Sequence, residues 1–108
     1  MLLAEYQELS KSTATYPKEA RFLYPALGLA GEAGEVAEHA KRVLRDDGGV
    51  LTPERRRAIA RELGDVLWYV AQLATEIGFS LEQIAVDNLD KLADRKRRGV
   101  LQGSGDNR

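Results

Sequence analysis

Several residue types and patterns are scarce in this 108-residue sequence, and each scarcity excludes a class of protein. There is no cysteine, which excludes disulfide scaffolds, thiolate zinc sites and cysteine nucleophiles. The single histidine, His39, excludes histidine-rich metal sites. No apolar stretch approaches the roughly 20 residues of a membrane span. The segment from Met1 to Glu5 lacks the basic region and long apolar run of a signal peptide, so we expect a cytoplasmic protein.

An excess of charge of one sign is also missing. The formal net charge is −1, which argues against nucleic acid and anionic membranes as partners. The basic run at residues 95–98 is better explained by the dipole of a helix that ends there. The composition, 44% hydrophobic and 31% charged, suits one globular domain over residues 1–108, with a tail at residues 99–108 whose lack of periodicity allows it to be flexible. A helical domain of this size has a modest core, so we expect it to oligomerise.

Strand patterns are nearly absent, and apolar residues recur at the 3.6-residue period of helices, which predicts an all-α fold. We expect helices over about residues 2–13, 25–45, 53–77 and 81–98. Thr52 and Ser80 are suited to cap the last two helices. Four residues of the last helix are expected to face inward: Leu81, Ile84, Leu89 and Leu92.

Two pairs of acids carry most of the functional information. Glu32 and Glu35 form the first pair, and Glu62 and Asp65 form the second. Residues three apart share a helix face, here beside the apolar stripe, where an unpaired carboxylate is costly to bury. Glycines also lie beside these acids, although glycine inside a helix costs about 1 kcal/mol relative to alanine. A cage for a hard divalent cation explains these features, while the pattern alone leaves ordinary surface charges open as well.

The ligand types narrow the choice of metal. An all-oxygen set of carboxylates suits Mg²⁺, with Mn²⁺ as a substitute. A di-iron centre in a helical bundle would require Glu-x-x-His motifs. The residue three positions before His39 is Val36, so the sequence does not contain that motif.

A resemblance to a known family rests on three segments. Glu32-x-x-Glu35 is followed, after 26 intervening residues, by Glu62-x-x-Asp65. With their neighbours, these pairs resemble the all-α nucleoside triphosphate pyrophosphohydrolases of the MazG-like superfamily, and the likeness covers nearly the whole chain. The segments that carry it are Gly28-Leu29-Ala30-Gly31-Glu32-Ala33-Gly34-Glu35-Val36, Glu62-Leu63-Gly64-Asp65-Val66-Leu67-Trp68-Tyr69 and Asn88-Leu89-Asp90-Lys91-Leu92.

The resemblance implies a fold and a reaction. It implies a MazG-like helical domain that forms four-helix bundles through oligomerisation, as a homodimer or homotetramer. The reaction is Mg²⁺-dependent hydrolysis of a (deoxy)nucleoside triphosphate to the monophosphate and pyrophosphate, which would remove non-standard or excess nucleotides. The metal ligands, through which catalysis would occur, are Glu32, Glu35, Glu62 and Asp65.

The resemblance also implies substrate contacts. Asn88 and Lys91 are expected to contact the phosphates, with Arg95 a further candidate. Trp68 is expected in the core or a subunit interface first and beside the base second, with Tyr16 and Tyr24 as other candidates. The tail is expected to fold back near the phosphates of its own or a neighbouring subunit.

The general base stays open. Some relatives carry an additional glutamate immediately before the first metal ligand, and here that position is Gly31. One of the ligands or Glu38 could activate the water instead. His39, one turn beyond Glu35, is expected to be a partly exposed helix residue, with a part in catalysis as the alternative.

Two other functions remain consistent with the sequence. The substrate could be a different diphosphate-containing metabolite such as phosphoribosyl-ATP, because the related enzymes share the helical fold. The chain could also be a non-catalytic nucleotide-sensing helical module. Four intact acids argue against the second alternative, because a protein without catalysis has no need of costly buried charge.

Overall fold

The computed structural model describes residues 1–108, and all of its regular elements are helices, which confirms the predicted all-α fold. No helix combines the length and the apolar character needed to cross a membrane. The long elements are α1 (Leu3–Ser10), α2 (Leu23–Asp46), α3 (Pro53–Glu76) and α4 (Leu81–Arg98). Two short 3₁₀ turns, Lys11–Thr13 and Lys18–Ala20, lie between α1 and α2.

Local hydrogen bonds explain where the last two helices begin and end. The Thr52 hydroxyl accepts the Arg55 backbone N–H at 3.1 Å, and the Ser80 hydroxyl accepts the Gln83 N–H at 3.0 Å. Gly99 ends α4 with a φ of 73°, a conformation that glycine adopts without steric cost. These contacts confirm the predicted caps.

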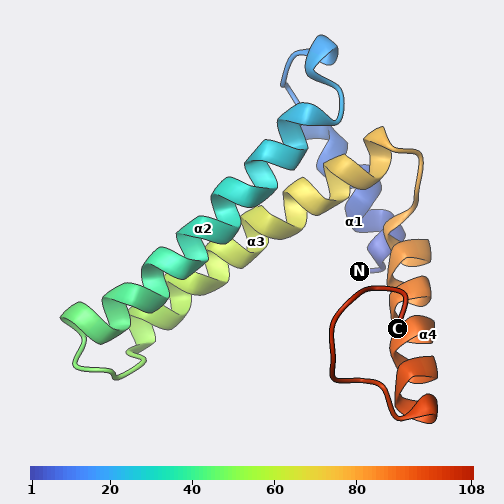
Figure 1. The fold of residues 1–108 in the computed structure, drawn as a ribbon. Helices are drawn as coiled ribbons and strands as arrows, with labels where there is room; N and C mark the ends of the chain where they lie inside the picture. Colours follow the sequence, from blue (N-terminus) through green and yellow to red (C-terminus); the bar gives the residue numbers. More distant parts are fainter.

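α2 and α3 form a long helical hairpin, and α1 and α4 lie to one side of it (Figure 1). α2 and α3 run antiparallel along most of their length, and α1 packs near the C-terminal end of α3. α4 packs mainly on α1 and extends clear of the hairpin. Gln7 of α1 fixes the start of α4, because its amide donates to the Phe79 carbonyl at 2.9 Å and accepts the Leu81 N–H at 2.8 Å.

A single chain buries little of itself. Only 7 of 108 residues are buried, and the apolar core consists of Ala71, Ala74 and Leu81. The radius of gyration is 16.7 Å, compared with about 13 Å expected for a compact domain of this length. Leu89 and Leu92 are 66% and 38% exposed, so the prediction that they face inward is wrong for the single chain. Their periodicity marks an apolar face, but nothing within the chain covers it.

Candidate metal centre

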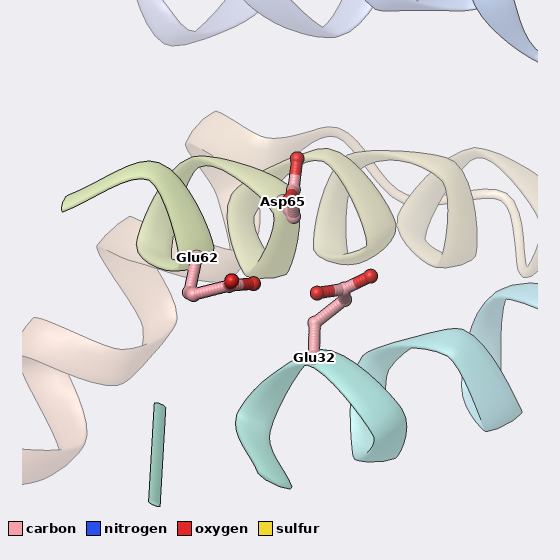
Figure 2. A group of neighbouring side chains, drawn as sticks. All are labelled: Glu32, Glu62 and Asp65. Carbon is pink, nitrogen blue, oxygen red and sulfur yellow. The ribbon is translucent and has the colours of Figure 1, made fainter. Parts of the chain in front are cut away.

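Three of the four predicted acids meet between the two long helices. Glu32 comes from α2, and Glu62 and Asp65 come from α3. Each offers one carboxylate oxygen, and these oxygens all lie within 4.8 Å of one another. Figure 2 shows Glu32 directed from α2 toward α3, with the Glu62 carboxylate reaching toward it. Spacing along each helix and the antiparallel pairing of the helices therefore bring these side chains together.

A close backbone approach supports this pairing. A Cβ atom on Gly28 would lie 2.2 Å from Cε1 of Tyr69, well inside van der Waals contact. Only glycine at position 28 allows the Tyr69 ring of α3 to pack this closely against the backbone of α2. By contrast, a Cβ atom on Gly31, Gly34 or Gly64 would meet nothing within 4 Å. Contacts within the chain therefore explain the glycine at position 28 and leave the other three unexplained.

The electrostatics of the cluster favour a cation. Partial burial, hydrogen bonding to Glu62 and the negative charge of Asp65 together raise the pKa of Glu32 above its ordinary value. Glu35, one turn further along α2, adds to this shift through its charge. Carboxylates crowded in this way repel one another when ionised, and a bound cation would relieve the repulsion. The donor set is all oxygen, which fits Mg²⁺ or Mn²⁺.

The remaining acid candidates lie outside the cluster. Glu35 is exposed and is not among the three residues whose oxygens converge, so its part in metal binding stays a prediction. Glu38 forms ion pairs with Lys41 at 2.9 Å and Arg42 at 3.7 Å. Hydrogen bonding to Lys41 lowers the pKa of Glu38, which makes it a weaker base.

Three residues next to the cluster received no firm function from sequence reasoning. His39 lies 3.6 Å from a Glu62 oxygen, and Arg55 contacts the other ring nitrogen of His39 at 3.0 Å. Asp47 accepts from Arg55 at 2.9 Å. The His39 side chain is 13% exposed, which agrees with the expectation of a partly exposed helix residue. The sequence feature that could have pointed to His39 is its position one turn beyond Glu35, on the helix that carries the first acid pair.

An aromatic group borders the acids. Trp68 packs edge-on to Tyr69 with ring centroids 5.0 Å apart, and its indole N–H donates to Thr13 at 2.9 Å. Tyr16 stacks on Tyr24 at 5.0 Å, and Tyr24 in turn lies 6.5 Å from Tyr69. These contacts give Trp68 a packing role in the single chain. A base contact by Trp68, Tyr16 or Tyr24 stays a prediction.

The predicted phosphate contacts lie on α4, away from the acids (Figure 1). The tail folds back along α4, and the Asp106 carboxylate accepts from Lys91 at 2.7 Å and from Arg95 at 3.0 Å. Arg95 is 5% exposed and Lys91 is half-buried, whereas Asn88 is exposed. The Asp106 carboxylate of the tail therefore pairs with Lys91 and Arg95, two of the cations predicted to bind phosphate.

Comparison with known proteins identifies the family. The sequence matches the model of the MazG nucleotide pyrophosphohydrolase domain over residues 24–100. The chain belongs to this family. It is also 49% identical over 109 residues to the Gene 37 protein of Mycobacterium phage L5, an alignment that covers 95% of this chain and 96% of the phage protein. No solved structure matches the chain.

Family membership gives the acid cluster its chemical context. The matched span contains both acid pairs as well as Asn88 and Lys91. The MazG family is a family of hydrolases that generally use a divalent metal, and Glu32, Glu62 and Asp65 form the group able to hold one.

Proposed function

We propose that this MazG-family chain hydrolyses (deoxy)nucleoside triphosphates to the monophosphate and pyrophosphate with Mg²⁺, and so removes non-standard or excess nucleotides. The observation that carries the proposal is the convergence of the carboxylates of Glu32, Glu62 and Asp65 within 4.8 Å in a chain of this family. A bound Mg²⁺ would offset the charge of the phosphate oxygens and lower the pKa of the attacking water.

The reaction breaks one bond and forms another. The oxygen of water bonds to the α-phosphorus, and the bond from this phosphorus to the α,β-bridging oxygen breaks, so that pyrophosphate leaves. Such phosphoryl chemistry depends mainly on positioning and charge stabilisation. An acid within the cluster, or Glu35 one turn from it on α2, is a better candidate than Glu38 for accepting the proton of water, because Lys41 and Arg42 stabilise the ionised form of Glu38. Glu35, which no ion pair holds, is free to do so.

We also propose that a second copy of the chain completes the site. α4 packs on α1 rather than beside the acids, so Asn88 and Lys91 of one chain do not flank its own cluster (Figure 1). The accessible surface of one chain is 7838 Å², compared with about 6,000 Å² expected for a compact 12.0 kDa protein. An excess of about 1,800 Å² per chain is the area that a large homodimer interface buries.

Apolar side chains on this surface support the same proposal. Leu27, Leu44 and Leu89 are each more than 60% exposed, on α2 and α4. The open space at Gly34 and Gly64 lies beside the acids, where another helix can approach the backbone closely. A homodimer or homotetramer that covers these residues would assemble four-helix bundles from pairs of hairpins.

The first experiment is a nucleotide panel with Mg²⁺, scored separately for pyrophosphate and orthophosphate. Glu62→Gln is the matched variant, because it removes one negative charge from the cluster and preserves side-chain size. Pyrophosphate release that the variant abolishes would support the proposal. Orthophosphate alone would mean that a different bond breaks. If folded wild-type protein releases neither product from the panel, the reaction is wrong, and phosphoribosyl-ATP becomes the next substrate to test.

A complementation experiment tests the shared site. Glu62→Gln and Lys91→Gln, each inactive alone, are unfolded together and refolded as a mixture. If α4 of one copy serves the acids of another, each mixed dimer contains one intact site, and part of the activity returns. A mixture that stays inactive would show that Glu62 and Lys91 act within the same chain.

A further inference from the structure

A polar chain of four side chains connects the turn after α2 to the acid cluster. Asp47 accepts from Arg55 Nε at 2.9 Å, and Arg55 Nη1 lies 3.0 Å from Nδ1 of His39. Nε2 of His39 then lies 3.6 Å from Oε1 of Glu62. These side chains are 13–21% exposed, whereas every other ion pair in the chain has a partner that is clearly exposed.

The direction of the hydrogen bonds follows from the chemistry of arginine. A guanidinium has only donors, so Nδ1 of His39 must accept from Arg55. A neutral imidazole that accepts at Nδ1 carries its proton at Nε2, the nitrogen that faces Glu62. Arg55 thus selects the form of His39 that presents an N–H to a carboxylate of the cluster.

Arg55 is itself held at both ends. Its backbone N–H donates to the Thr52 hydroxyl at the start of α3, and its side chain forms two contacts with Asp47, at 2.9 and 3.4 Å. This paired geometry fixes the guanidinium plane, which a single contact would not. Arg55 therefore differs from its neighbour Arg56, which is exposed and has no ion pair.

From these contacts we propose that His39 is a positioning residue that holds the Glu62 carboxylate in the orientation needed for a divalent cation, with Arg55 and Asp47 fixing the ring. The inference rests on the metal site of the proposed function. The 3.6 Å separation is longer than the roughly 3.2 Å limit of an ordinary hydrogen bond, so the Glu62 oxygens stay available to a cation while the ring limits the orientations open to the carboxylate. Removing a residue that orients a metal ligand typically weakens metal binding by about 10- to 100-fold.

The test measures Mn²⁺ affinity by electron paramagnetic resonance on the full chain, with no turnover required. His39→Phe removes both ring nitrogens and keeps a planar ring, and we expect it to weaken Mn²⁺ binding by about 10- to 100-fold. His39→Gln should restore most of the affinity, because its amide can accept from Arg55 and donate to Glu62. Arg55→Gln should weaken binding, and the matched control Arg56→Gln should not.

Each outcome either supports or overturns the positioning role. If His39→Phe binds Mn²⁺ as tightly as wild type, or if His39→Gln is as weak as His39→Phe, the proposal is wrong. Should Arg55→Gln fail to fold by circular dichroism, the two His39 variants decide. Wild-type protein that binds no Mn²⁺ would overturn the metal site itself, a result distinct from normal binding in His39→Phe.

Discussion

The contact between Gly28 and Tyr69 leads to a prediction about the sign of a glycine-to-alanine substitution. Inside a helix, this substitution normally stabilises by about 1 kcal/mol. At position 28 the new Cβ would lie 2.2 Å from the Tyr69 ring, so the ring must move by more than an ångström to reach ordinary contact. Overpacking of this kind costs about 1–3 kcal/mol.

Neighbouring aromatic rings restrict the movement of Tyr69 on two sides. It packs against Trp68 at 5.0 Å and lies 6.5 Å from Tyr24, and such aromatic pairs are worth about 0.5–1.5 kcal/mol each. The overpacking cost of about 1–3 kcal/mol equals or exceeds the gain of about 1 kcal/mol, so Gly28→Ala should be destabilising by up to about 2 kcal/mol in total. A loss of 1 kcal/mol lowers Tm by roughly 4–8 °C in a domain of this size.

The assay combines thermal unfolding with the emission of Trp68, the only tryptophan in the chain. Gly31→Ala is the matched control, because its Cβ would meet nothing within 4 Å and should raise Tm. Gly28→Ala should lower Tm and shift the emission as Tyr69 moves off the indole. The reasoning fails if Gly28→Ala raises Tm as much as Gly31→Ala and leaves the emission unchanged.

Three further substitutions test other contacts. Thr52→Ala removes the cap of α3 and should cost about 1 kcal/mol, seen as a Tm lower by roughly 4–8 °C; an unchanged Tm would show that the cap contributes nothing. Burial and a 2.6 Å hydrogen bond to Glu76 raise the pKa of Tyr16 to about 12. This stabilisation is complete below pH 10 and lost as the pH rises through 12, so Glu76→Gln should lower the pKa seen by ultraviolet titration of the phenolate. Asp106→Asn removes the ion pair between the tail and Lys91, so the variant should bind inorganic pyrophosphate more tightly, as measured by calorimetry. An unchanged affinity would mean that the tail does not compete with pyrophosphate for Lys91.

The parts of the fold that could be predicted from the sequence depend on neighbours within one or two turns. Thr52 and Ser80 cap their helices through bonds to residues three positions on, so local sequence specifies them. The meeting of Glu32 with Glu62 required one step more, the antiparallel pairing of two adjacent amphipathic helices. A short turn between long helices makes that pairing the natural arrangement.

Other features could not be predicted, because they depend on distant contacts. The link from His39 to Arg55 spans 16 residues and exists only once the turn closes. The periodicity of α4 predicted that Leu89 lies on its apolar face, but periodicity does not specify what covers that face. Here α4 packs mainly on α1, with only its first residues reaching α3, and Leu89 stays exposed. The attachment of the tail to Lys91 through Asp106 likewise lies outside any local pattern.

The three converging carboxylates all come from one uninterrupted helical hairpin, residues 23–76. Their arrangement therefore depends on the pairing of α2 with α3 and on the turn that joins them, and none of the three side chains comes from α1, α4 or the tail. Substitutions in α4 and the tail can consequently leave the three carboxylates of the hairpin in place. The acid cluster and the polar groups of α4 can in this sense vary independently of each other.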